Sequence, residues 1–142
     1  YGGLIPGTAE AIRHLRATSP WQAGSTPLPA PVTAATAAAL RITRTEPELR
    51  ARLARNVATV RDGLRRLGLA VEDLPTPIIP LVTGDGAAMQ RLHDALRADG
   101  VLVPYLSRYT GLGPHGALRV AVFATHDPEQ IRCLLDALRR HL

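Results

Sequence analysis

The sequence contains no lysine, because all 17 of its basic residues are arginine. Arginine stays protonated near neutral pH and forms no Schiff base, so no side chain of this sequence can act as a catalytic amine. The single cysteine, Cys133, excludes an internal disulfide and is typical of a reducing compartment. No apolar run approaches the roughly 20 residues needed to cross a membrane, and no secretory leader opens the sequence. These absences predict a cytoplasmic protein with no membrane partner.

Aromatic residues are also few: one Trp, three Tyr and one Phe. They are scattered rather than interleaved with the arginines, which disfavours a single-stranded nucleic-acid surface despite the formal charge of +5. The histidines lack the spacing of metal ligands, and the sequence has no Walker loop and no nucleophile elbow. We therefore expect no metal site and no nucleic-acid partner. The length of 142 residues suffices for one hydrophobic core.

The most regular stretch of the sequence runs from residue 117 to residue 138. Residues 117–123 alternate as in a strand, with Leu118 and every second residue after it on one face. Asp127 is a good helix N-cap, and Pro128 suits the first helical position, where no amide hydrogen is needed. An apolar stripe then predicts a helix that packs on the same face of the sheet: Ile131, Leu134, Leu135 and Leu138.

Arg119 occupies the middle of this predicted strand. If Leu118 and Val120 face the helix, the guanidinium of Arg119 emerges on the opposite face of the sheet. A charged group in that position needs an anion, a carboxylate or water. Arg119 is therefore the candidate functional residue.

The first third of the sequence predicts two helices and a loop. A helix of about ten residues follows Thr8, with Ile12 and Leu15 expected inside. The loop at residues 19–31 contains four prolines, which exclude a helix there. An alanine-rich helix is expected from residue 32.

A second helical start follows at residue 45. Thr45 and Glu48 match a capping box, with Thr45 as the N-cap. We expect two consecutive helices or one helix kinked at Pro47, ending at Gly68. The arginines of the second helix are expected on a solvated face, opposite its apolar stripe: Leu49, Leu53, Val57, Val60, Leu64 and Leu67.

From residue 69 onward, short strands and helices alternate. Asp85 is expected to cap a helix at residues 86–98, and Pro80 places its strand at a sheet edge. The pattern predicts an α+β fold with helices packed on one face of a small, mostly antiparallel sheet, preceded by a long kinked linking helix. The strands are expected at residues 69–71, 76–82, 101–103 and 117–123.

Ser25 and Thr26 are two adjacent hydroxyl residues between Gly24 and Pro27. Their hydroxyls and an amide could bind a phosphate, although the local pattern by itself favours an ordinary loop turn.

Four segments form motifs that occur in a characteristic order: the glycine-rich residues Gly2, Gly3 and Gly7, the loop at residues 24–29, and the stretches 76–85 and 117–131. Together they resemble the C-terminal portion of a pyridoxal-phosphate-dependent enzyme of fold type I. Within the class I and II aminotransferase superfamily, they resemble in particular the α-oxoamine synthases, which include 8-amino-7-oxononanoate synthase and glycine C-acetyltransferase. The resemblance covers nearly the whole chain.

The resemblance implies a role for each candidate residue. Arg119 would bind the carboxylate of the amino-acid substrate, and Ser25 and Thr26 would bind the cofactor phosphate in trans across a homodimer. The substrates would be an amino acid and an acyl-CoA, and the cofactor pyridoxal 5′-phosphate. No lysine is present to hold the cofactor, so this chain alone is expected to be inactive.

The resemblance also divides the chain into three parts. Residues 1–31 would be the tail of the large cofactor-binding domain with an active-site loop, residues 32–68 linking helices, and residues 69–142 the small domain. The loop at residues 105–116 lacks the proline-rich pattern usual in the synthases. A class I or II aminotransferase therefore remains an alternative, as does a non-catalytic module that retains the small-domain fold.

Overall fold

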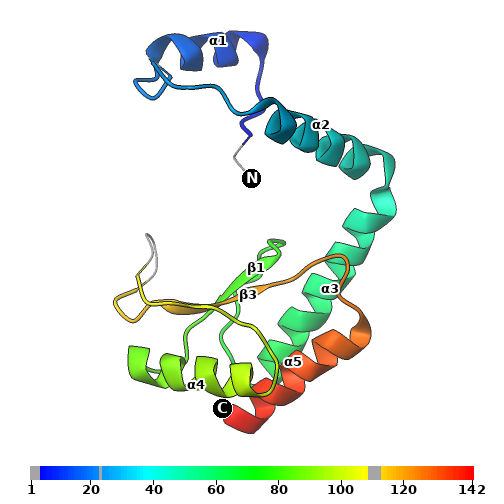
Figure 1. Ribbon diagram of the computed structural model, residues 1–142. Coiled ribbons are helices and arrows are strands. Elements are labelled where there is room, and N and C mark those ends of the chain that lie inside the picture. The colour runs from blue at the N-terminus through cyan, green and yellow to red at the C-terminus, as the bar shows by residue number, and fades with distance from the viewer. Residues whose placement is uncertain (1–3, 23, 109–112) are drawn as a thin grey trace. The chain divides into compact units, whose positions relative to one another are not determined.

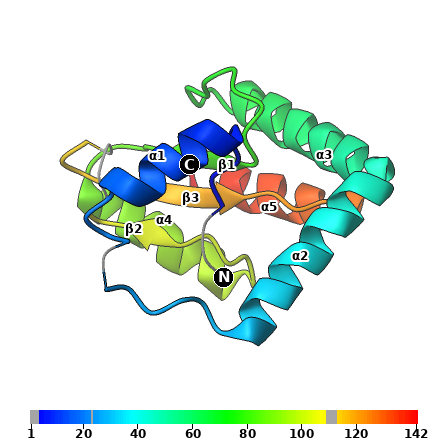
Figure 2. The ribbon, with the colours of Figure 1, turned by 90° about the horizontal axis from the view of Figure 1, so that it is seen from above.

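The computed structural model describes residues 4–22, 24–108 and 113–142 (Figures 1 and 2). Gly2 and Gly3, which contribute to the glycine-rich motif, lie outside the described residues. The chain forms two compact units, Tyr1–Glu46 and Pro47–Leu142. The functional residues expected from the sequence fall in both units, so each unit is described separately.

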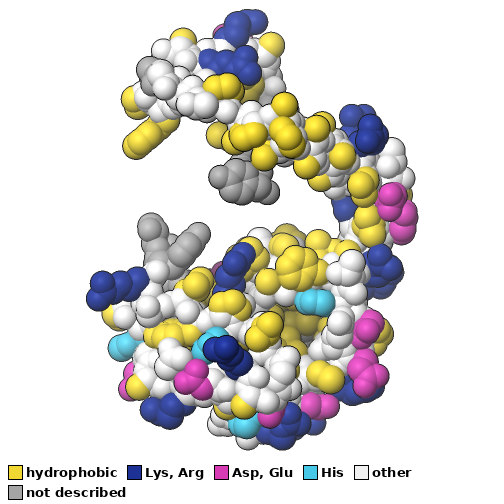
Figure 3. Space-filling view, in the orientation of Figure 1, with side chains coloured by type: hydrophobic (Ala, Val, Ile, Leu, Met, Phe, Trp, Pro, Cys, Tyr) yellow, Lys and Arg dark blue, Asp and Glu magenta, His cyan; other side chains and the backbone are white. Residues whose placement is uncertain are grey.

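The first unit consists of helices α1 (Ala9–Thr18) and α2 (Ala30–Thr45). Thr8 caps α1, because its hydroxyl accepts a hydrogen bond from the amide of Ala11 at 3.2 Å. Neither helix has a buried residue, and Figure 3 shows hydrophobic side chains at the surface over α2. The expectation that Leu15 lies inside is wrong, because 44% of its surface is exposed.

Helix α3 (Pro47–Arg66) follows α2 after one residue, which confirms two consecutive helices. The predicted capping box is wrong. Thr45 lies in the last turn of α2, where its hydroxyl donates to the carbonyl of Arg41 at 3.0 Å. The break falls at Glu46, whose backbone is not helical (φ −119°, ψ 72°), because a proline disfavours helical geometry in the residue before it.

The second unit contains an antiparallel sheet in the order β1-β3-β2, formed by Ile78–Leu81, Ala117–Ala121 and Tyr105–Leu106. Helices α3, α4 (Gly86–Ala98) and α5 (Pro128–His141) lie on one side of it (Figure 1). Strand β1 is an edge strand, as Pro80 predicted. The α+β fold expected from the sequence is confirmed. Its core is made of fully buried side chains from the sheet and all three helices: Ile79, Leu81, Leu118, Leu64, Met89, Leu96 and Leu138.

Two of the predicted strands are absent. At residues 69–71, the amide of Leu69 donates to the carbonyl of Leu64 and that of Gly68 to the carbonyl of Arg65. These bonds, with Gly68 at φ 79°, end α3 in a Schellman motif and occupy the backbone that a strand would need.

The strand expected at residues 101–103 is also absent, and β2 begins only at Tyr105. Arg119 donates its amide to the carbonyl of Pro104 at 2.8 Å. Pro104 has no N–H to return that bond, so the ladder ends there.

Candidate functional site

Arg119 lies in the middle of β3, the central strand of the sheet. Its neighbours Leu118 and Val120 are buried on the helix-covered face, with 0% and 3% of their surfaces exposed. The side chain of Arg119 is exposed on the opposite face. The predicted alternation of this strand is therefore confirmed, and it places the guanidinium on the open side of the sheet.

Prolines lie opposite Arg119 on both sides, one within β1 and one directly before β2. Pro80 is its register partner on β1, and Pro104 lies opposite it on the other side. Both prolines are exposed, and neither ring can accept a hydrogen bond from the guanidinium. Among the described residues, the Arg119 side chain makes no hydrogen bond and no ion pair, so its donors remain available for a carboxylate.

Two exposed apolar side chains lie on the same face of the sheet as Arg119. Ile78 is 44% exposed and Phe123 58% exposed, and both lie on the same face of the strands as Arg119 because the side chains alternate. The open face of the sheet is therefore partly apolar.

Ser25 and Thr26 lie in the loop between α1 and α2, in the other compact unit. Both residues are exposed. The hydroxyl of Ser25 donates to the carbonyl of Gln22 at 3.2 Å, as expected of a local turn. The described residues of the first unit therefore present these hydroxyls at its surface, and Arg119 belongs to the other unit.

Sequence reasoning missed Arg61 on α3, which was expected on a solvated face. Its surface is only 5% exposed. The guanidinium donates to the backbone carbonyls of Glu72 and Thr76, the latter at 3.1 Å, and to the Thr76 hydroxyl at 3.3 Å. These hydrogen bonds hold the segment that leads into β1 against α3. Its spacing from Val57 and Leu64, four and three residues away, was the signal that places it on the apolar stripe.

Asp99 joins the C-terminal ends of α4 and α5. Its carboxylate pairs with the guanidinium of Arg140 at 2.7 Å and with the ring of His141 at 2.9 Å. These two hydrogen bonds, the one from Arg140 foremost, hold the pKa of the Asp99 carboxyl below its ordinary value. All three side chains are partly exposed, and their pairing joins the ends of the two helices.

Two kinds of site are absent from the part of the chain that the structure describes. It contains no cluster of three or more histidine, cysteine, aspartate or glutamate side chains that could bind a metal ion. Within the same residues, no helix is both long enough and apolar enough to cross a bilayer.

Solved structures share the fold of this chain. A serine palmitoyltransferase from S. paucimobilis, with a bound PLP–myriocin aldimine, matches with a TM-score of 0.81 and 22% identity over 92% of this chain and 33% of that chain. An 8-amino-7-oxononanoate synthase from Francisella tularensis matches with a TM-score of 0.74 and 21% identity over 94% of this chain and 39% of that chain. The chain thus has a fold found in the pyridoxal-phosphate enzymes of fold type I.

The family follows from the sequence comparisons. The family described as aminotransferase class I and II matches residues 1–138. The 8-amino-7-oxononanoate synthase of Xanthomonas campestris pv. campestris (strain B100) is 37% identical over 138 residues, which are 97% of this chain and 34% of the relative. The chain belongs to the class I and II aminotransferase family, and the resemblance to the α-oxoamine synthases is confirmed. It spans about a third of the length of the curated relatives it matches.

Proposed function

We propose that this chain is the C-terminal part of a pyridoxal-phosphate-dependent transferase that condenses an amino acid with an acyl-CoA, in the manner of 8-amino-7-oxononanoate synthase. The observation that carries the proposal is the exposed guanidinium of Arg119, which lies at mid-strand between two prolines and donates to none of the residues that the structure describes. Identity of 37% to an 8-amino-7-oxononanoate synthase along nearly the whole chain supports the reaction type.

Arg119 binds the carboxylate of the amino-acid substrate. Its planar guanidinium can donate two parallel hydrogen bonds, which fix the orientation of the carboxylate as well as its position. The backbone of Arg119 is held by strand pairing on both sides, so the binding group is carried by a rigid element. Orientation of the substrate at this end directs its α-carbon toward the reacting centre.

The residues of this chain are suited to bind only one part of the cofactor, its phosphate group. Ser25 and Thr26 offer exposed hydroxyls suited to the phosphate of pyridoxal phosphate in the neighbouring subunit of a homodimer. The chain has no lysine for a covalent link, and by itself it is therefore inactive. When bound, the cofactor supplies an electron sink for the negative charge that develops on the amino acid. The same proposal includes the division of the chain into residues 1–31, 32–68 and 69–142. It also includes a cytoplasmic location.

Aminotransfer on the same scaffold is the second candidate function. The segment at residues 105–116, whose first two residues form β2 rather than part of a loop, departs from the proline-rich pattern of the synthases, and this departure favours aminotransfer. An assay of the complete enzyme separates the two candidates, because the synthase releases free CoA from an acyl-CoA, whereas the aminotransferase converts an amino acid and an oxo acid without it. Absence of both activities in a complete, cofactor-loaded enzyme favours a non-catalytic module.

Substitution of Arg119 in the complete enzyme tests the carboxylate role. Arg119→Lys keeps the charge but loses the paired geometry, and Arg119→Ala loses both. Loss of a charge-assisted pair, about 1.5–3 kcal/mol, corresponds to a roughly 10- to 150-fold fall in kcat/KM for the amino acid. Arg132→Ala, on the exposed surface of α5, is the matched control. A collapse of the melting temperature with unchanged kcat/KM contradicts the proposal.

Mixed dimers test the trans role of Ser25 and Thr26. The double change to alanine is expected to weaken cofactor retention in the complete enzyme. Combining this variant with one that lacks the cofactor lysine is expected to restore one active site per dimer. A mixed dimer that is folded but inactive contradicts binding in trans.

A further inference from the structure

One pair of backbone hydrogen bonds is missing where the sheet register calls for it. Arg119 lies opposite Pro104, and Tyr105 is paired with Leu118. Because backbone groups alternate along a strand, the next residue of β3 to present its N–H and C=O at this edge is Ala121, opposite Leu102. Neither of the two hydrogen bonds between Ala121 and Leu102 is formed.

Two residues of the segment 101–103 form hydrogen bonds to α4. The amide of Val101 donates to the carbonyl of Leu96 at 2.8 Å. The carbonyl of Val103 lies 2.8 Å from Nδ1 of His93, also on α4. Pro104 cannot donate to Arg119. The sheet edge is open at Ala121, whose N–H and C=O have no hydrogen-bond partner among the described residues.

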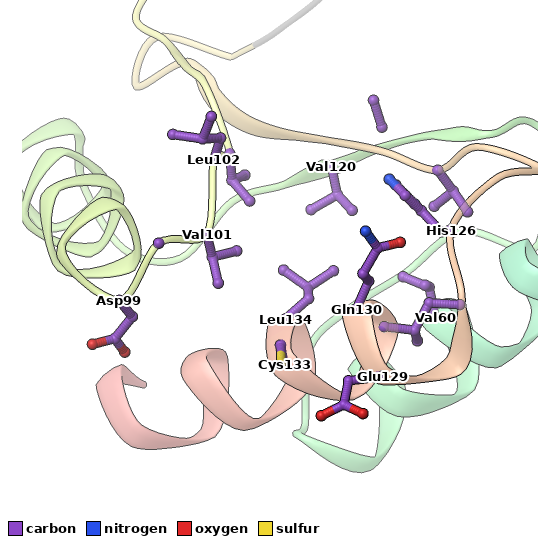
Figure 4. A pocket seen from close by; sticks show the side chains of 15 residues that line it. Val60, Asp99, Val101, Leu102, Val120, His126, Glu129, Gln130, Cys133 and Leu134 are labelled. Atoms are coloured by element: carbon purple, nitrogen blue, oxygen red, sulfur yellow. The ribbon is translucent and has the colours of Figure 1, made fainter.

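A groove of about 550 Å³ occupies this opening. Figure 4 shows its walls: Val120 of β3 on one side, Val101 and Leu102 on another, and Leu134 of α5 below. Gln130 extends into the groove with its amide end toward Val120. The amide oxygen of Gln130 accepts from the backbone of Asp127 at 3.0 Å, whereas its NH₂ group has no partner among the described residues.

We propose that this groove is a binding site for a small peptide-type amide, a ligand with an –NH–CHR–CO– unit whose R group is branched and aliphatic. The N–H and C=O of Ala121 point the same way and pair with the C=O and N–H of such a unit, as a neighbouring strand does. The valine and leucine walls receive the R group, and the NH₂ of Gln130 donates to the adjoining carbonyl. The volume lies in the range of small-ligand sites.

Titration of the 142-residue chain with N-acetyl-L-valine N-methylamide, followed by amide NMR, tests the site. The resonances of Ala121, Leu102 and the Gln130 side chain are expected to shift and saturate together. The amides of Arg119 and Val122, already bonded to Pro104 and Pro77, serve as internal controls. An analogue methylated on the valine nitrogen lacks the N–H that pairs with Ala121, and is expected to bind at least about 10-fold more weakly. Equal binding of both compounds, or no saturation, overturns the proposal.

Two variants locate the binding within the groove. Leu134→Trp fills the cavity and abolishes the shifts, whereas Arg132→Trp, on the exposed side of the same helix, leaves the affinity within about 2-fold. If Leu134→Trp does not fold, Gln130→Glu decides: it keeps an oxygen that can accept from Asp127 and replaces the NH₂ donor with a charged oxygen that cannot donate. Weaker binding supports the site, and unchanged binding contradicts it. Hydrogen exchange adds a further check. Protection of the Ala121 amide equal to that of Val122 in the free chain shows that residues 101–103 close the edge themselves, and it overturns the proposal.

Discussion

The two compact units of the chain differ in how they use their apolar residues. In the first unit, neither helix buries a side chain, and Trp21 and Ile5 are 86% and 74% exposed. In the second, side chains from three helices and the sheet close a continuous core. Short helices without a buried face are marginally stable in water. The stability of this chain therefore resides in residues 47–142, which also carry Arg119, whereas Ser25 and Thr26 lie in the unit without a core.

The largest expected effect is the difference in the free energy of unfolding between a leucine substitution in the second unit and one in the first. Leu64→Ala removes a fully buried side chain of α3 and is expected to lower the free energy of unfolding by about 2–5 kcal/mol. Leu40→Ala removes a side chain of α2 that is 45% exposed, and is expected to change it by less than about 0.5 kcal/mol. Urea unfolding followed by circular dichroism measures both. Equal losses contradict the contrast between the units.

Arg61 is a buried arginine of α3, and Arg65 is an exposed arginine of the same helix. Arg61→Met leaves the carbonyls of Glu72 and Thr76 without their donor, and is expected to cost about 1–3 kcal/mol. Arg65→Met breaks an exposed ion pair with Asp73 and is expected to cost at most about 1 kcal/mol. The same unfolding experiment applies. A smaller loss for Arg61 than for Arg65 shows that the buried hydrogen bonds contribute little.

The N-caps of α5 and α1 allow the two units to be compared again. The carboxylate of Asp127 accepts from the amide of Gln130 at 2.8 Å and starts α5. Asp127→Ala is expected to lower the free energy of unfolding by about 1 kcal/mol. Thr8→Ala removes the corresponding cap of α1, but is expected to reduce only local helix content, because α1 buries nothing. Amide exchange separates the two outcomes. A global loss of protection in Thr8→Ala shows that the first unit contributes to the main transition.

The smallest expected effect concerns pH. Because the folded-state pKa of Asp99 is lowered by Arg140 and His141, this carboxylate contributes stability above its unfolded-state pKa, and the contribution is lost as the pH falls through the folded value. Asp99→Asn is therefore expected to lower the urea midpoint at pH 7 and to converge with the unchanged protein in strong acid. Asp94→Asn is the control, since Asp94 accepts from the neutral Gln90 side chain. A difference for Asp99→Asn that persists unchanged in acid contradicts the ion-pair role.

Helix starts in the second unit could be predicted because their signals are local. Asp85 and Asp127 each accept from an amide three residues later, a bond that depends only on the adjacent sequence. Thr45 carried a similar signal, but its hydroxyl bonds back into α2. The hydroxyl of a threonine can either cap the next helix or donate to a carbonyl of the preceding one. The sequence pattern at Thr45 therefore did not determine which of the two bonds forms.

The sequence by itself determined the alternation of β3, and with it the face on which Arg119 emerges, because a strand's period of two follows from backbone geometry. It also determined the class of fold and the family. The spacing of Arg61 places it on the apolar stripe of α3, but only the tertiary structure supplied the carbonyls of Glu72 and Thr76 that bury its guanidinium. The tertiary structure likewise decided that the sheet opens at Ala121. Pro104 interrupts the hydrogen bonding of the sheet only when Arg119 lies opposite it. These two residues are too far apart in the chain for a local sequence pattern to predict that they pair.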